Sequence, residues 1–266
     1  MNIHHRSYLS SLLYSSSLFL SCANAADNSI YIQQTGNGDV FSITQSGSGN
    51  SVGGAEYSAP GINPTTHAQI SSGNNHVTIR QGDFLAQTGN NKIALAVLGS
   101  DNILNLNQGT NEFGYVTGLD QGNHYQIDYV KGFANIVTVV QENTTTNAGM
   151  FSSLELTGNF NTVGIIQTGS AANQLFANIY GNNNLLSTNQ SGTSPHSLTV
   201  TESGSGNSAK VNQNNTGAIG SNVATINLIN NGAPASVNLT QTGGQNYMIT
   251  QSCMTACGTV MIKQGN

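Results

Sequence analysis

The chain has 266 residues, of which only 6% are charged, none is Trp and 31 are Gly. Globular domains carry about 25% charged residues, so the composition excludes an ordinary helical domain with a salt-bridged surface. The formal net charge of −5 disfavours nucleic acid as a partner, because no basic patch is present to neutralise phosphates.

Residues 1–25 have the pattern of a signal peptide. A weakly basic start around Arg6 precedes a short apolar run over residues 12–20, and an A-x-A cleavage site follows at residues 23–25. The run is too short and too rich in Ser to span a bilayer. The sequence therefore predicts a secreted bacterial protein. Cys22 leaves a lipoprotein signal open as an alternative, although the residues before it match a lipobox poorly.

From Asn28 onward, a unit Asn-x5-Gln-x-Gly-x2-Asn recurs about every eleven residues. The first copy runs from Asn28 through Gln34 to Asp39, and the second follows at once through Gln45 to Asn50. A short fixed period indicates a supersecondary unit that buries its apolar face only by stacking on its neighbours.

Within each unit, the positions two and four residues after the leading Asn are mostly apolar, as at Val77 and Ile79 or Val163 and Ile165. This alternation predicts a strand whose even positions share one face. The Asn and the Gln have the same parity, so we expect them to face inward beside the apolar pair. The fold predicted is all-β, a β-solenoid of stacked strand-turn-strand rungs of about 22–23 residues.

A turn after each Gln is expected to need a glycine with positive φ or tight packing. The glycines at this position are Gly36, Gly47, Gly89, Gly169, Gly192, Gly204 and Gly243.

The units fall into two alternating classes, which we call arcs. One arc keeps Gln at its sixth position, at Gln81, Gln108, Gln141, Gln167, Gln190, Gln213, Gln241 and Gln264. The other arc places Val97, Tyr129, Leu156, Ile179, Glu202, Leu228 and Ser252 at the corresponding point. A buried amide without a partner costs about 1–3 kcal/mol, so stacking must pair each amide with its equivalent in the next rung. We expect one arc to hold an amide ladder, and drift at a tolerant site explains the loss of Gln from the other arc. The alternative is that this edge of the rod is drier and less strictly registered.

Three interruptions divide the chain. Residues 26–51 form a first rung, residues 52–66 contain Gly and Pro and are predicted to be a loop, and residues 67–266 form the remaining solenoid. Lengthened turns are expected at residues 109–122 and 142–149, outside the stack.

The repeat resembles that of the curlin-repeat family, the subunits of bacterial curli fibres. Asn28 through Asn50 reproduces the family unit, with Asp39 in place of its middle Asn. The resemblance implies an exported β-solenoid that polymerises into a functional amyloid fibre for cell adhesion and biofilm matrix. It also implies self-association or other curlin-type subunits as partners, together with an outer-membrane secretion pore and periplasmic chaperones. The family's ladder positions correspond here to Asn28, Gln34, Gln45, Asn50, Gln81, Gln108, Gln141, Asn161, Gln167, Asn184, Gln190, Asn207, Gln213, Gln241 and Gln264.

Catalytic and metal-binding patterns are sparse, so no enzyme, metal site or cofactor is predicted. The histidines show no metal-ligand spacing, and His196 falls at an Asn position of the repeat, which favours a substitute in the ladder or turn. Cys253 and Cys257 are an even pair, and an oxidising compartment favours a disulfide that staples the last turn. Two free thiols are the alternative.

The sequence leaves three functions open. The first is an extracellular fibre subunit, and the second is a minor or nucleating subunit for another fibre protein. The third is a monomeric surface adhesin or glycan-binding protein that displays aromatic and histidine side chains on its long turns, at Tyr57, Phe113, Tyr115 and His124.

Overall fold

The computed structural model describes residues 17–23, 28–56, 59–63, 68–82, 89–109, 124–143, 149–215, 220–230, 232–255 and 257–265. These residues form strands joined by turns. They contain no helix, and therefore none long and apolar enough to cross a membrane.

Ten strands form one parallel sheet, called sheet 1. In spatial order they are β1 (Ser17–Ala23), β4 (Val40–Ser46), β8 (His76–Gln81), β10 (Ile103–Gln108), β12 (Ile136–Asn143), β14 (Thr162–Gly169), β16 (Leu185–Gly192), β18 (Ser208–Asn215), β20 (Ser236–Thr242) and β22 (Thr259–Gln264).

Twelve strands form the facing sheet, called sheet 2. They are β2 (Ser29–Ile30), β3 (Ile32–Asn37), β5 (Ser51–Glu56), β6 (Ala59–Asn63), β7 (Ala68–Gly73), β9 (Lys92–Leu98), β11 (Tyr125–Lys131), β13 (Phe151–Thr157), β15 (Gln174–Tyr180), β17 (His196–Thr199), β19 (Asn222–Asn230) and β21 (Asn246–Cys253).

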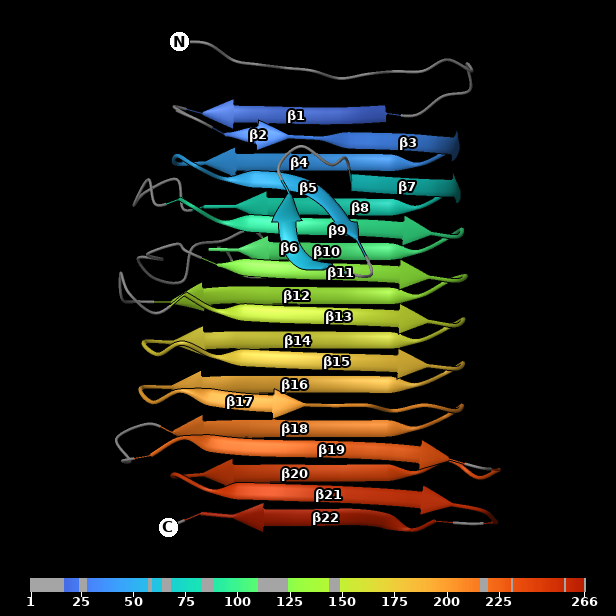
Figure 1. Ribbon diagram of the computed structural model, residues 1–266, viewed down its shortest axis with the longest axis vertical. Coiled ribbons are helices and arrows are strands. Elements are labelled where there is room, and N and C mark those ends of the chain that lie inside the picture. Colours follow the sequence, from blue (N-terminus) through green and yellow to red (C-terminus); the bar gives the residue numbers. More distant parts are fainter. Residues whose placement is uncertain are drawn as a thin grey trace.

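The chain alternates between the two sheets, and each strand pairs in register with the strand one rung away. Figure 1 shows the result as a single stack from β1 at one end to β22 at the other. Where the repeat is unbroken, equivalent residues are 23 apart, as for Thr162, Leu185 and Ser208. The predicted all-β solenoid is confirmed.

The segment at residues 52–66 is not entirely the loop that the sequence predicted. Residues up to Gly54 of β5 pair in parallel with β9, and β6 then folds back to pair antiparallel with β5. This hairpin lies against the stack (Figure 1) and contains the one antiparallel pairing among the described strands. Most residues of the other predicted interruptions, at 109–122 and 142–149, lie outside the described residues. Glu142 and Asn143, however, belong to β12 and pair with Thr168 and Gly169 of β14, so the expected turn outside the stack begins later than predicted.

Part of the predicted signal peptide is a strand of the stack. β1 pairs in parallel with β4, from Ser17 opposite Val40 to Ala23 opposite Ser46. Cleavage after residue 25 remains a prediction, and it would remove this strand from sheet 1.

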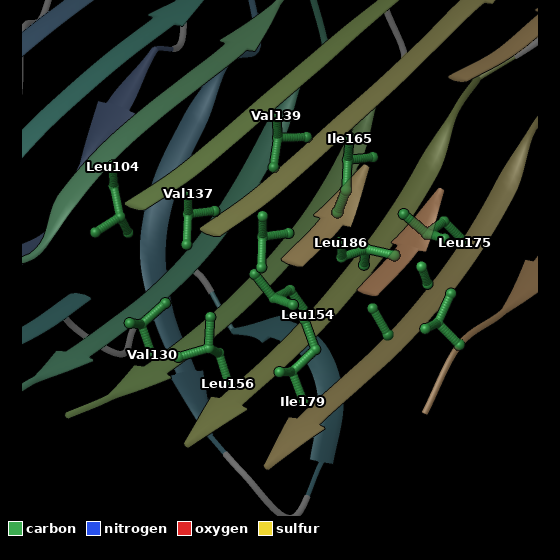
Figure 2. Close-up of a cluster of buried hydrophobic side chains, with 14 of the residues drawn as sticks. Leu104, Val130, Val137, Val139, Leu154, Leu156, Ile165, Leu175, Ile179 and Leu186 are labelled. Carbon is green, nitrogen blue, oxygen red and sulfur yellow. The ribbon is translucent and has the colours of Figure 1, made fainter. Parts of the chain in front are cut away.

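The core is the narrow space between the sheets, filled by the apolar residues that the alternating pattern places inward. In β12, Val137 and Val139 are fully buried, whereas Ile136 on the other face is 42% exposed. Figure 2 shows the side chains of the two sheets meeting: Leu104, Val137, Val139, Ile165 and Leu186 from sheet 1, and Val130, Leu154, Leu156, Leu175 and Ile179 from sheet 2. Each such side chain contributes about 1.5–3 kcal/mol on burial, so the core grows with every added rung.

The turns that lead from sheet 2 into sheet 1 stack glycine on glycine. The column is Gly99, Gly132, Gly158, Gly181 and Gly204, all with positive φ. A Cβ on Gly158 would lie 1.8 Å from the carbonyl oxygen of Gly181. A side chain at these five positions would therefore collide with the neighbouring rung at strand spacing. Ser72, which takes the equivalent place between Gly36 and Gly99 with a φ of 90°, is the exception in the column.

Replacement of Gly158 by Ala is expected to destabilise the protein by at least about 2 kcal/mol, because φ is +136° and the Cβ meets backbone of the next rung. The control is Gly164→Ala in β14, where the nearest atom to a Cβ is 4.0 Å away and no positive φ opposes it. Urea unfolding followed by circular dichroism checks both variants. Equal stabilities for the two would contradict the steric account of the glycine column.

Candidate functional site

A continuous ladder of buried glutamines runs along sheet 1. Each side chain donates from Nε2 to Oε1 of the next glutamine over 2.8–3.0 Å. The members are Gln45, Gln81, Gln108, Gln141, Gln167, Gln190, Gln213 and Gln241. Consecutive members are separated by 23 residues at Gln167–Gln190 and by 36 at Gln45–Gln81. Insertions in the sequence are thus absorbed outside the ladder.

The same amides also tie sheet 1 to sheet 2. An amide has two N–H donors, and the second donates across the core to a backbone carbonyl at the start of a sheet 2 strand. Examples are Gln108 to Lys92 O at 3.1 Å, Gln167 to Phe151 O at 3.0 Å and Gln190 to Gln174 O at 3.0 Å. Each glutamine therefore fixes both the height of its own strand and the height of the facing one.

A second ladder lies at the start of the sheet 1 strands, one residue before each. Its members are Asp39, Asn75, Asn102, Asn135, Asn161, Asn184 and Asn207, and each side-chain Oδ1 accepts the backbone N–H of the next member over 2.8–3.1 Å. The side-chain Nδ2 groups also reach the glycine column: Asn135 Nδ2 donates to Gly158 O at 2.8 Å, and Asn161 Nδ2 donates to Gly181 O at 2.9 Å. The Gly-x2-Asn part of the repeat therefore forms the turn from sheet 2 into sheet 1, with the Gly in the glycine column and the Asn in this ladder.

The ladder residues expected from the sequence are divided between the two sheets. Asn161, Asn184 and Asn207 belong to the sheet 1 ladder, while Asn28 and Asn50 lie at the start of sheet 2 strands, where Asn28 Oδ1 accepts Asn50 N–H at 2.9 Å. The ladder residues expected from the sequence did not include Asn75, Asn102 and Asn135. Each of these stands two residues before an apolar position and therefore fits the leading Asn of the unit.

The two outermost glutamines behave differently from the interior ones. Gln34 lies in sheet 2 in register with Ile70, and its Nε2 donates to Asp39 Oδ2 at 3.0 Å. Gln264 is in register with Gln241, but its Nε2 donates to Gln245 Oε1 at 2.9 Å instead of continuing the ladder.

Sheet 2 replaces the glutamine ladder by an apolar column over most of its length. The in-register residues are Ile70, Val97, Val130, Leu156, Ile179 and Leu228. Two sequence expectations were wrong by one residue: Val130 takes the place predicted for Tyr129, and Gln251 takes the place predicted for Ser252. The arcs differ as predicted, and sheet 2 carries Gln at this position in its first and last described rungs, at Gln34 and Gln251.

Glu202 interrupts the apolar column. It follows β17, continues the register between Ile179 and Leu228, and is fully buried with no hydrogen-bond partner for either carboxylate oxygen. Desolvation by burial raises the pKa of Glu202 to about 9.

Asp128 is a second buried acid, on the inner face of β11. Desolvation by burial raises its pKa to about 7, against the opposing effect of the hydrogen bond from Gln126. Glu202 therefore keeps its proton across the neutral range, whereas Asp128 loses its proton within that range.

Two of the described histidines, His124 and His196, occupy ladder positions. His196 N–H donates to Asn173 Oδ1 at 3.1 Å, and its ring Nε2 lies 2.7 Å from Ser191 O. Burial lowers the pKa of His196, although the bond to Ser191 opposes this. His124 N–H donates to Asn91 Oδ1 at 3.0 Å, and the side chain is buried. His124 is therefore not displayed on a long turn as one sequence hypothesis required; Tyr57, Phe113 and Tyr115 lie outside the described residues.

Cys253 and Cys257 form a disulfide in the turn that leads from β21 to β22, with their Cα atoms 5.6 Å apart.

Most of the predicted turn glycines have positive φ, namely Gly36, Gly47, Gly169, Gly192, Gly204 and Gly243. Gly89 does not, but a Cβ there would lie 1.7 Å from Ser48 O. Among the described residues, no group of three or more His, Cys, Asp or Glu side chains is placed to hold a metal ion.

No protein-family model, curated protein or solved structure matches this chain.

Replacement of Gln167 by Leu is expected to destabilise the protein by about 2–3 kcal/mol, because Gln190 Oε1 then loses its donor inside the core. The control is Asn189→Leu, one residue before Gln190 on the exposed face of β16. Urea unfolding measures both. A Gln167→Leu variant as stable as its control would contradict a stabilising role for the ladder.

The buried Glu202 predicts that stability falls as pH rises. Since the pKa in the folded state, about 9, exceeds the ordinary value of 4.5, the folded chain holds the proton more tightly than the unfolded chain. The stabilisation is fully present below pH 4.5 and is lost as pH rises through 9, at up to about 1.4 kcal/mol per pH unit.

We expect Glu202→Leu, which matches Ile179 and Leu228, to flatten this decline and to raise stability at pH 8. Glu155→Leu on the outer face of β13 is the control and should keep the slope of the wild type. Urea midpoints from pH 5 to pH 9 provide the test. A slope unchanged by Glu202→Leu would show that another group causes the dependence.

Proposed function

We propose that this protein is an extracellular structural subunit that polymerises by stacking its rungs end to end into a curli-like amyloid fibre. The two ends of the stack carry the proposal, because they have matching strands, matching apolar positions and matching amides.

At one end, Ile30 and Ile32 of sheet 2 are half-buried against the core, and Gln45 Oε1 in sheet 1 is buried without a hydrogen-bond partner. At the other end, Val260 and Ile262 of β22 are half-buried. Interior residues at the same positions are fully buried. Both ends therefore retain apolar area that an added rung would cover.

The glutamines of the end rungs match across a junction of two copies. If a second copy continues the register of the first, Gln264 of one copy lies over Gln45 of the next copy in sheet 1. In sheet 2, Gln251 of the first copy lies over Gln34 of the next. Gln251 Oε1 is also buried without a partner. Docking of two copies would bury both oxygens in the junction, and each would then face an amide that can donate to it, which avoids the cost of about 1–3 kcal/mol for a buried acceptor without a partner.

The setting of the proposed fibre comes from the sequence. Residues 1–25 favour export, and the resemblance to curlin repeats adds cell adhesion and biofilm matrix as the roles of the fibre. Whether the chain is the bulk subunit or a minor one depends on how it assembles alone.

The test is incubation of the chain from residue 26 to residue 266 at micromolar concentration with thioflavin T, electron microscopy and fibre diffraction. We expect a lag, seedable growth and a meridional reflection near ~4.8 Å. Gln251→Leu should slow seeded elongation by about tenfold, equivalent to about 1.4 kcal/mol at the junction, while the stability of the monomer changes little. Asn189→Leu is the control and should elongate like the wild type. A chain that stays monomeric for days and seeds nothing would overturn the fibre function in favour of a monomeric surface protein.

A further inference from the structure

β1 occupies the position of one additional rung on sheet 1. Its residues pair with β4 in the same direction and register that β8 uses on the opposite edge of β4. The register column that begins at Ser17 continues through Val40 and His76, and at the far end of sheet 1 it reaches Thr259 of β22. Continuation of the stack into a second copy would therefore place Thr259–Gln264 over Val40–Gln45, where β1 now lies.

Along the strand, β1 matches β22 at the two inward apolar positions and differs from it at the amide position. Leu18 and Leu20 stand where β22 has Val260 and Ile262. Cys22 stands where β22 has Gln264, and cysteine has no amide to donate. Gln45 Oε1, directly in register, is buried and has no partner. β1 thus pairs with the backbone of the edge and leaves the ladder unfinished.

The burial of the first rung differs between the two sheets. Beneath β1, Phe41 and Ile43 of β4 are 2% and 1% exposed. In sheet 2 the first rung has no such cover among the described strands, and Ile30 and Ile32 are only half-buried. β1 therefore closes one of the two sheet edges at this end.

We propose that the edge of β4 is the docking site for β22 of a second copy, and that residues 17–23 hold this site in the uncleaved chain. The proposal rests on the proposed fibre function. It adds the order in which the two ends of successive copies dock, and the cleavage step that controls docking. Hydrolysis of the peptide bond after Ala25 by a processing peptidase, with water as the co-reactant, releases the strand and opens the edge.

The uncleaved chain is then a one-sided building block. Its β22 edge can still dock on the open β4 edge of a fibre, but its own β4 edge is covered, so the next copy cannot follow. Small amounts of uncleaved chain should therefore stop growth at one fibre end and leave the other end growing.

The experiment compares full-length chains as additions to fibre seeds grown from residues 26–266. The wild-type chain of residues 1–266 is expected to elongate seeds at least about tenfold more slowly than the cleaved chain. Phe19→Pro/Leu20→Pro should restore elongation to within about threefold of the cleaved chain, since adjacent strand residues point their N–H groups to opposite edges and one proline must remove a bond to β4. Phe19→Ile/Leu20→Ile keeps the strand and is the matched control, which should elongate as slowly as the wild type.

Single-fibre fluorescence microscopy then follows labelled cleaved chain after seeds have been treated with substoichiometric full-length chain. Growth from one end only supports the docking of β22 on β4. If cleaved and full-length chains elongate seeds equally, or if both ends remain active after treatment, the docking proposal is overturned while the fibre function stands. If the cleaved chain forms no seeds at all, the fibre function fails and the docking proposal fails with it.

Discussion

In-register stacking is the constraint on which this structure depends. A residue in a parallel solenoid has its equivalent one strand spacing above and below it, so its chemistry must be compatible with a copy of itself. A buried amide meets this condition because it donates from one atom and accepts at another, and Gln141, Gln167 and Gln190 do so in series. The ladder has a direction, because every interior Nε2 donates toward the next rung. Its first member therefore presents an acceptor, and the strand that completes it must bring a donor.

The two sheets meet this condition in different ways. Sheet 1 depends on hydrogen bonds, which tolerate little displacement along or across the stack, and its strands stay in register even where ladder members are separated by 36 residues instead of 23. Sheet 2 depends on apolar contact, which is non-directional. Sheet 2 accordingly contains the short strand β17, the hairpin of β5 and β6 and the buried Glu202. The irregular features of the molecule therefore lie in sheet 2, where apolar stacking requires the least exact geometry.

The sequence predicted the periodic part of the fold correctly. It was wrong where a neighbouring Asn shifted the apparent start of a repeat unit by one residue. The apolar pairs named from the spacing, such as Val77 and Ile79, and the sheet 1 glutamines lie on the inner face as predicted, because their spacing is set by the strand itself. The inward pair of β11, Gln126 and Asp128, is polar and did not follow the pattern. Tyr129 and Ser252 stand six residues after Asn123 and Asn246, which the repeat pattern takes as leading positions. The leading positions are in fact His124 and Gln245, whose N–H groups donate to Asn91 and Asn222. A neighbouring Asn is enough to shift the count by one residue, and only the hydrogen bonds of the stack distinguish the two registers.

The low charge of the chain follows from the same constraint. A charged residue that repeated along a column would face its own kind every ~4.8 Å, which is destabilising for residues directly opposite. The charged strand residues instead have neutral neighbours in register: Thr44 and Asn107 for Arg80, Tyr129 and Asn178 for Glu155, Ser187 and Asn238 for Lys210, and Thr240 for Lys263. Charges are therefore admitted singly, which limits their total and accounts for the 6% in the composition. The rule extends to the proposed junction, where Lys263 of one copy would stand over the neutral Thr44 of the next. A chain that must stack on itself within one molecule has already met the electrostatic condition for stacking on another.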